Sequence, residues 1–352
     1  MKYEKDQNMK LVKTTEAVGH VLCHDITQII PGVSKGPVFK KGHIVTEEDI
    51  PVLLSVGKEN LYIWENHEGM LHEDEAAEIL RDICIGGADG FHASAPSEGK
   101  ITIKAAKDGL LKIRSDALLA VNSLGRMMIA TVHGNMPVKA GDQIAGTRII
   151  PLVIEEEAMR EAERVAGSDP ILSILPYEIQ NAGIVTTGSE VAAGRIQDAF
   201  GPVLREKLAA YDVSVIAQHI LPDDPERITK AILDLAKGGA QMILVSGGMS
   251  VDPDDRTPKA IKDTGARIIS YGAPVLPGAM FLLSYLSYEG RTIPVAGLPG
   301  CVMYAKRTIF DLVLPRILAK EELTAADLAT YGEGGLCKNC EVCTYPNCGF
   351  GK

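Results

Sequence analysis

The feature that most constrains the fold is an alternation of two hydrophobic periods between residues 181 and 320. This stretch contains four short apolar runs, each a predicted strand, at 184–187, 213–220, 242–246 and 292–298. Helices with one apolar face are predicted between and after them, at 199–211, 225–237 and 302–318. Alternation of this kind is typical of a parallel sheet with right-handed helical crossovers. We therefore predict an α/β fold in which residues 178–320 form a three-layer, parallel-sheet domain.

Two smaller modules are expected before this domain. Residues 10–70 read as an α+β unit, in which Thr46 and Asp49 start a helix that Gly57 ends, and a strand follows at 61–64. Residues 71–166 read as a β-rich module of unknown role, a small barrel or half-barrel. It has predicted helices at 74–85 and 155–166 and predicted strands at 101–105, 110–113, 127–132 and 143–150.

Glycine-rich or acidic residues follow each predicted strand of the C-terminal domain. They are Thr187-Gly188-Ser189-Glu190 with Asp198, then Asp223-Asp224-Pro225, then Gly247-Gly248-Met249-Ser250 with Asp255, and finally Pro299-Gly300. Ligands of parallel α/β sheets bind at the carboxyl ends of the strands. Glycine lets backbone N–H groups approach a phosphate, and carboxylates bind Mg²⁺ or accept hydrogen bonds from amino groups. The alternative for any single carboxylate is a helix cap, such as Asp223 or Asp224 before Pro225.

At these residues the sequence resembles the molybdopterin-binding domain of molybdenum-cofactor biosynthesis proteins. Residues 14–64 also resemble part of the molybdopterin molybdenumtransferase scaffold, especially 39–42 and 46–57. The resemblance implies a transferase that binds molybdopterin and a nucleotide and uses Mg²⁺ and molybdate. It implies insertion of molybdenum into molybdopterin, in its free or adenylated form. A homodimer is a further expectation of the resemblance.

The resemblance also assigns roles to individual residues. Four acidic residues fall on positions that matter for activity in this family or in the related adenylyltransferases: Glu190, Asp198, Asp223 and Asp255. Eight residues would bind the cofactor: Thr187, Gly188, Ser189, Gly247, Gly248, Ser250, Pro299 and Gly300.

The sequence departs from the family pattern in ways that keep other functions open. Leu276 and Ala279 stand where molybdenumtransferases tend to carry lysines, and Ser189 stands where an Asp is usual. One alternative is a carrier or sensor that binds molybdopterin without turnover and has a redox-active cysteine tail. Others are a molybdopterin adenylyltransferase and a nucleotide pyrophosphatase. Cys301 is expected to be a small buried residue, with a metal-ligand role as the alternative.

The last residues, 331–352, form a cysteine-rich tail. It carries Cys337, Cys340, Cys343 and Cys348, with two, two and four residues between them. Such spacing lets one short loop wrap a metal centre, and the first three resemble ferredoxin-type ligation. The tail is therefore predicted to hold an iron–sulfur cluster or Zn²⁺. The preceding Gly-rich run, 331–335, predicts a flexible hinge.

Composition excludes several other classes. A formal net charge of −10 argues against a nucleic-acid partner, because phosphate backbones are bound by basic surfaces. No apolar stretch approaches the roughly 20 residues that cross a bilayer, and the first 13 residues contain no signal-peptide core. We therefore expect a cytoplasmic protein with no membrane partner.

Overall fold

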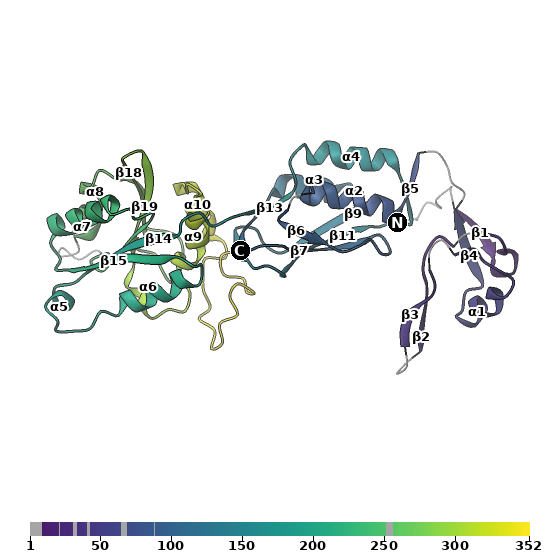
Figure 1. The fold of residues 1–352 in the computed structure, drawn as a ribbon, viewed down its shortest axis with the longest axis horizontal. Coiled ribbons are helices and arrows are strands. Elements are labelled where there is room, and N and C mark those ends of the chain that lie inside the picture. The colour runs from purple at the N-terminus through teal and green to yellow at the C-terminus, as the bar shows by residue number, and fades with distance from the viewer. Residues whose placement is uncertain are drawn as a thin grey trace. The chain divides into compact units, whose positions relative to one another are not determined.

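The computed structural model describes residues 9–20, 22–30, 34–40, 43–64, 69–87, 89–250 and 256–352 (Figure 1). The chain divides into two compact units. The first comprises Met1–Ala106, Arg114–Val132 and Gly141–Ser173, and the second comprises Lys107–Ile113, His133–Ala140 and Ile174–Lys352. None of the helices in the described part is both long and apolar enough to cross a bilayer.

The first unit begins with a small α+β arrangement. Strand β1 (Met9–Lys13) pairs antiparallel with β4 (Asn60–Trp64), and β2 (Ile26–Ile30) pairs antiparallel with β3 (Ser34–Phe39). Helix α1 (Asp49–Ser55) begins where the sequence predicts, since the backbone and hydroxyl of Thr46 both donate to Asp49. A short 3-10 turn, η1 (Thr14–Glu16), follows β1.

The rest of the first unit is an open sheet with helices on one side (Figure 1), so the closed-barrel alternative of the prediction is wrong. Its antiparallel strand order is β6 (Phe91–Ala93), β7 (Lys100–Ala105), β11 (Gln143–Ile149), β9 (Met127–Thr131). The helices are α2 (Glu73–Ile85), α3 (Ser115–Ser123) and α4 (Glu156–Ala166). A two-stranded pair joins β5 (Met70–His72) to β12 (Val153–Glu155). Leu80 of α2 and Val121 of α3 are fully buried and supply the hydrophobic core of this region. The sheet therefore does not have to close on itself to bury an apolar face.

A separate three-stranded sheet has the order β10-β8-β13. Its strands are β10 (Met136–Val138), β8 (Gly109–Ile113) and β13 (Leu172–Leu175). Helix α9 (Ile309–Leu318) of the second unit contacts β8 and β10.

The second unit is built on a six-stranded sheet with the order β15-β14-β16-β19-β18-β17. Strands β15 (Ser214–Leu221), β14 (Asn181–Thr187), β16 (Ile243–Ser246) and β19 (Arg291–Leu298) are parallel, as predicted. Strands β18 (Leu282–Tyr288) and β17 (Arg267–Tyr271) were not predicted, and they extend the sheet antiparallel to their neighbours. The sheet is therefore mixed and mostly parallel rather than wholly parallel.

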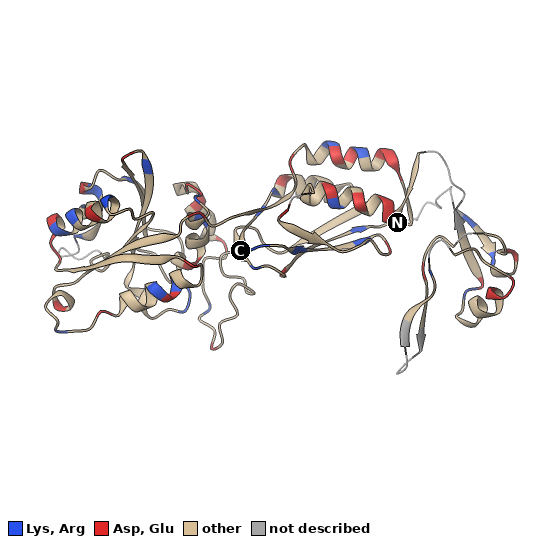
Figure 2. Ribbon diagram, in the orientation of Figure 1, with Lys and Arg blue, Asp and Glu red and all other residues tan. Residues whose placement is uncertain are grey.

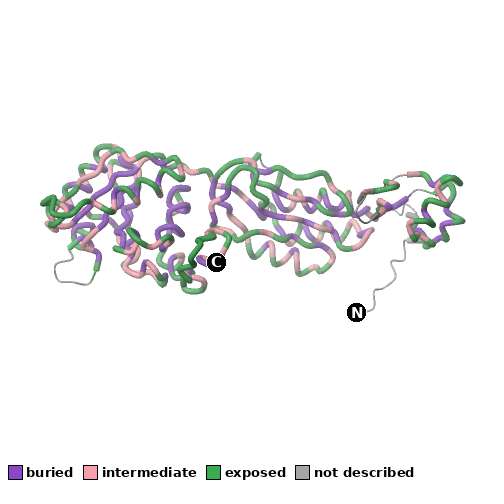
Figure 3. Tube along the Cα trace, turned by 90° about the horizontal axis from the view of Figure 1, so that it is seen from below, coloured by how far each residue is buried: buried purple, intermediate pink, exposed green. Residues whose placement is uncertain are grey.

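Helices cover both faces of this sheet. Leu204 of α6 (Phe200–Ala209) and Phe310 of α9 pack in the core of one face, and Ile232 of α7 (Pro225–Lys237) and Ile261 of α8 (Thr257–Asp263) pack in the core of the other. The central strands β14 and β16 carry no charged residue and are almost wholly buried. Charged residues lie along α7 and α8 (Figure 2), and buried residues gather inside each unit (Figure 3). The predicted three-layer architecture is confirmed.

The predicted long helix at 302–318 is wrong at its start. Residues Gly300–Met303 form a 3-10 turn, η2, and α9 begins only at Ile309. Thr308 caps α9, because its hydroxyl accepts from the Phe310 N–H while Asp311 accepts from the Thr308 N–H. The chain then continues through α10 (Ala325–Ala329) and the 3-10 turn η3 (Thr330–Gly332) into the cysteine-rich tail.

Candidate functional site

The carboxyl ends of four parallel strands lie at one edge of the six-stranded sheet. Thr187 of β14 is in register with Leu221 of β15, and Ser246 of β16 is in register with Thr186 and with Leu298. The loops that follow these strands therefore leave from the same edge. Tyr271 of β17 belongs to this edge too, since it is in register with Leu282, which lies opposite Gly297.

The first two loops are joined by a hydrogen-bonded pair. The Ser189 N–H and Ser189 hydroxyl donate to the same Asp223 oxygen, at 2.9 and 3.1 Å. The N–H of Gly188 donates to the Leu221 carbonyl at 3.1 Å, and Gly188 has φ 148°, which side-chain-bearing residues rarely adopt. These contacts hold Glu190, an exposed residue of the short helix α5 (Ser189–Ala192), beside the second loop.

The structure separates the roles of the two adjacent aspartates. Asp224 is the N-cap of α7 and accepts hydrogen bonds from the N–H groups of Glu226 and Arg227. Asp223 makes the contact with Ser189 instead. The helix-cap alternative therefore describes Asp224 and not Asp223.

Asp198 serves the start of α6. Its carboxylate accepts from the N–H groups of Phe200 and Gly201 and from the Gln218 amide, the last at 2.6 Å. The same Gln218 amide donates to the Thr186 hydroxyl at 3.1 Å. Asp198 thus ties α6 to β14 and β15, a structural task that the sequence did not indicate.

The third loop requires glycine at two consecutive positions. Gly247 has φ 90°, and a Cβ there would lie 2.2 Å from the Thr187 carbonyl oxygen. Gly248 has φ 56°, and its Cβ would lie 2.8 Å from the Thr257 hydroxyl. Thr257 fixes this turn: its hydroxyl donates to the Gly247 carbonyl at 2.8 Å and its N–H donates to the Gly248 carbonyl at 3.3 Å.

The turn continues over a buried methionine. Met249 is buried, and a Cβ on Gly297 of β19 would lie 2.6 Å from the Met249 methyl group. The Tyr271 hydroxyl lies 3.0 Å from the Met249 carbonyl and 3.2 Å from that of Ser250, which is itself exposed. Asp255, predicted to be catalytic, falls within 251–255 and lies outside the described residues.

The fourth loop contains a buried proline followed by an open glycine. Pro299 is buried and Gly300 is exposed, and a Cβ added to Gly300 would have no heavy atom of the described residues within 4 Å. Cys301 is half-buried, and burial raises the pKa of its thiol. A thiol kept protonated in this way behaves as a small apolar residue.

The described part of this edge offers carboxylate oxygens for a cation but no complete cage. Glu190 and Asp223 lie on adjoining loops, and no group of three or more His, Cys, Asp or Glu side chains in the described ranges is arranged to hold a metal. Mg²⁺ usually binds one or two carboxylates together with substrate phosphates. The two carboxylates fit that mode.

The sequence analysis did not single out three residues whose hydrogen bonds shape this edge: Gln218, Thr257 and Tyr271. Gln218 and Tyr271 lie within strands, where only the tertiary pairing shows which groups they meet. Thr257 had a local signal, because it precedes Pro258 at the start of α8, a position where a proline is favoured.

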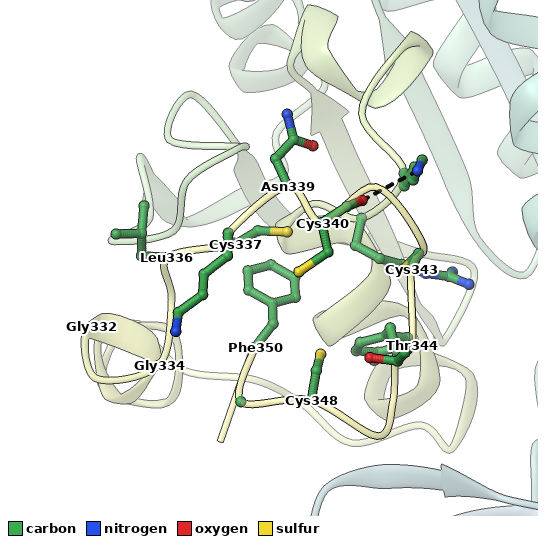
Figure 4. A pocket seen from close by; sticks show the side chains of 15 residues that line it. Gly332, Gly334, Leu336, Cys337, Asn339, Cys340, Cys343, Thr344, Cys348 and Phe350 are labelled. Atoms are coloured by element: carbon green, nitrogen blue, oxygen red, sulfur yellow. Dashed lines mark hydrogen bonds between the residues drawn. The ribbon is translucent and has the colours of Figure 1, made fainter.

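The predicted metal ligands of the tail lie around a separate pocket. All four cysteines line a cavity of about 450 Å³, and the sulfurs of Cys337, Cys340 and Cys348 turn toward the space beside the Phe350 ring (Figure 4). They are not close enough to form a ready-made metal site among the described residues. The predicted hinge is an ordered part of the domain instead, since the Leu276 N–H donates to the Gly335 carbonyl and the Gly351 N–H donates to that of Gly334.

Comparison with known proteins identifies two segments. Residues 183–319 match the family described as "Probable molybdopterin binding domain", and residues 11–65 match a domain of unknown function. The first match covers the six-stranded sheet and the four loops at its carboxyl edge.

Individual relatives match over parts of their length. A "CinA-like protein" of Mycolicibacterium paratuberculosis is 34% identical over 119 residues, which are 34% of this chain and 27% of that protein. A "Molybdopterin molybdenumtransferase" of Synechococcus elongatus is 26% identical over 163 residues, 44% of this chain and 38% of that protein. The chain thus spans about a quarter to two fifths of these relatives.

Among solved structures, the tungsten cofactor synthesizing protein MoaB from Pyrococcus furiosus is similar with a TM-score of 0.35 and 20% identity, over 41% of this chain and 99% of that one. The family match and the sequence relatives together show that residues 183–319 of this chain are a molybdopterin-binding domain, related to molybdenum-cofactor biosynthesis proteins and to CinA-like proteins.

Proposed function

We propose that the chain binds molybdopterin, free or adenylated, at the carboxyl edge of the six-stranded sheet and inserts molybdenum into it. The observation that carries the proposal is the Gly247–Gly248 turn, in which both residues have positive φ and no room for a Cβ. A turn of this kind, next to the ends of three other parallel strands, is suited to a phosphate.

The hydrogen bonds of the turn support a role in anion binding. The carbonyls of Gly247 and Gly248 both accept from Thr257, which directs them toward α8. The N–H groups of Gly248 and Met249 donate to no backbone carbonyl among the described residues. A phosphate-binding turn needs carbonyl groups that are already hydrogen-bonded within the protein and N–H groups that can still donate to a ligand.

The carboxylates of this edge would bind Mg²⁺ or the amino groups of the ligand. Glu190 is exposed and directly follows Ser189, whose N–H donates to Asp223, so the two carboxylates would hold Mg²⁺ against a phosphate or accept hydrogen bonds from the amino groups of a pterin. When bound, Mg²⁺ offsets the negative charge of a phosphate or diphosphate. Asp223 also fixes the first loop through Ser189, so its removal would affect the shape of the site as well as its charge.

The test is a turnover assay with the full chain, adenylated molybdopterin, molybdate and Mg²⁺. We expect metal insertion by the wild type and its loss in Asp255→Ala, with an unchanged melting temperature. Molybdopterin adenylylation in place of insertion would support the adenylyltransferase alternative. Release of phosphate from a dinucleotide without pterin would instead support a pyrophosphatase.

A second candidate, a carrier or sensor that binds without turnover, is favoured by one observation. Leu276, at a position where molybdenumtransferases tend to carry lysines, is exposed and its backbone pairs with Leu336 and Cys337 of the tail. This segment therefore offers a docking point for the tail and no cation for molybdate. Binding of molybdopterin with no product under any combination of molybdate and nucleotide would select this function.

A further inference from the structure

The tail that carries four cysteines is built into the second unit. Tyr345 and Phe350 stack edge to face, with ring centroids 6.4 Å apart, and Phe350 is buried in the core beside α9. The Tyr345 hydroxyl donates to the Asp311 carbonyl of α9 at 3.2 Å. These contacts hold the C-terminal end of the cysteine segment against the domain.

A backbone ladder attaches the start of the segment to the domain. The Leu276 N–H donates to the Gly335 carbonyl and the Cys337 N–H donates to the Leu276 carbonyl, both at 2.8 Å. Gly335 is needed there, because a Cβ would lie 2.5 Å from the Pro274 carbonyl oxygen. The loop that contains Leu276 follows β17, which ends at the same sheet edge as the molybdopterin-binding loops.

The four thiols surround one space. The pocket they line has a volume of about 450 Å³, and Figure 4 shows the sulfurs of Cys337, Cys340 and Cys348 turned toward the space beside the Phe350 ring. Cys340 and Cys343 are exposed, whereas Cys337 and Cys348 are half-buried against the core. The two exposed thiols are therefore the ones that an incoming metal can reach first.

Two cations lie against the same segment. The Lys306 ammonium donates to the carbonyls of Cys340 and Glu341, at 3.3 and 2.5 Å. Arg307 lines the same pocket as Cys343 and lies 4.8 Å above the Tyr345 ring. One of its guanidinium N–H groups donates to Asp311 at 2.9 Å, while its Nε is buried with no partner among the described groups. Four thiolates around a dipositive core carry a net charge of about −2, which two neighbouring cations offset.

The spacing of the cysteines favours one of the candidate metals. Cysteine thiolates hold both structural Zn²⁺ and iron–sulfur clusters, so the residue types alone fit either centre. The two-residue spacing of Cys337, Cys340 and Cys343 is the one found in bacterial ferredoxin-type ligation.

We propose that Cys337, Cys340, Cys343 and Cys348 bind a [4Fe–4S] cluster in this pocket, with Lys306 and Arg307 offsetting its charge. The centre is distinct from the molybdopterin-binding edge, and the proposal does not depend on which reaction that edge performs.

The experiment uses the full chain, purified without oxygen and reconstituted with Fe²⁺ and sulfide. We expect about four iron and four sulfide per chain and a broad visible absorption band that bleaches on reduction. Replacing Cys337 and Cys340 together by Ser should abolish the band. The matched control is Cys84→Ala, a buried cysteine of the first unit, which should keep it.

A second variant tests the role of the cations. The double substitution Lys306→Gln and Arg307→Gln should retain the cluster but lower its reduction potential. The reduced cluster is the more negative form, and the variant lacks the positive charges that stabilise it. Stoichiometric zinc without iron, or equal iron uptake by the Cys337→Ser, Cys340→Ser variant, would overturn the proposal. Circular dichroism of each variant separates loss of the cluster from loss of the fold.

Discussion

Ser189 donates two hydrogen bonds to one carboxylate oxygen of Asp223, which lies 34 residues later in the sequence. The Ser189 N–H donates at 2.9 Å and the Ser189 hydroxyl at 3.1 Å. The pair joins the loops after β14 and β15, so the carboxyl edge has a defined shape before any ligand arrives. It also explains why serine suits this position, since an aspartate at residue 189 would place two carboxylates in contact.

The adjacent aspartates, Asp223 and Asp224, should respond differently to alanine. Asp223→Ala removes the acceptor of Ser189 and is expected to weaken molybdopterin binding tenfold or more with little loss of stability. Asp224→Ala removes the cap of α7 and should lower the free energy of unfolding by about 1 kcal/mol while leaving binding unchanged. Calorimetric titration and urea unfolding of both variants check this. Equal effects of the two on binding would contradict the division of roles.

Gly247→Ala should disrupt the third loop. A left-handed φ costs a residue with a side chain about 1–2 kcal/mol, and the new Cβ would also meet the Thr187 carbonyl oxygen. We expect a lower melting temperature and loss of molybdopterin binding. Gly300→Ala, where a Cβ has open space, should melt like the wild type. Similar melting temperatures for the two variants would show that the turn has no such constraint.

A buried ion cluster holds the end of α9. Arg316 is 3% exposed and donates to both oxygens of Glu321 at 2.8 Å and to Asp327 at 3.0 Å. Arg316→Ala removes the buried partner of both carboxylates, although Glu321 keeps Lys112 and Asp327 keeps Thr324, and should lower the free energy of unfolding by roughly 1.5–3 kcal/mol. The control is Lys230→Ala, which breaks an exposed pair with Asp234 and should cost less than about 1 kcal/mol. Denaturant unfolding measures both, and a small effect of Arg316→Ala would count against the cluster.

The same cluster predicts a loss of stability in acid. Although burial opposes the charge of Asp327, hydrogen bonds from Thr324 and Arg316 lower its pKa to about 2, and Arg316 and Lys112 lower the pKa of Glu321. Because unfolded carboxyl groups have pKa values near 4, the folded state binds fewer protons between about pH 4 and pH 2. The contribution is fully present above pH 4 and is lost as the pH falls toward 2.

Urea titrations at several pH values check this, with Arg316→Met as the reference. The free energy of unfolding of the wild type should fall more steeply below pH 4 than that of the variant. Parallel curves would show that the two carboxylates keep ordinary pKa values in the folded chain.

The sequence predicted the parts of the fold that depend on local pattern. The four parallel strands and helix α7, which runs from Pro225 to Lys237 as expected, have clear periodicity and a cap at Asp224. Strands β17 and β18 were missed, because residues such as Ser284 and Tyr285 interrupt the apolar run and are buried only through pairing with β19. The start of α9 was misplaced because the capping box of Thr308 and Asp311 lies inside an otherwise helix-like stretch.

The sequence predicted where the candidate site lies, but not all of the contacts that its residues make. Asp223, Gly247 and Gly300 were predicted to lie at one edge because each follows a parallel strand, and the carboxyl ends of parallel strands meet at the same edge of a sheet. The sequence could not show which carboxylates have structural partners. Asp198 accepts from the Phe200 N–H at the start of α6 and from Gln218, a contact between residues 20 apart that only the folded sheet creates.

The most direct test of the central claim is an anaerobic calorimetric titration of the full chain with molybdopterin, for the wild type and for Gly247→Ala. We predict one molybdopterin per chain for the wild type and no measurable binding for a variant that still shows the α/β circular dichroism spectrum. Absence of binding to the wild type, or equal affinity of a folded Gly247→Ala chain, would contradict the claim that this sheet edge holds the ligand.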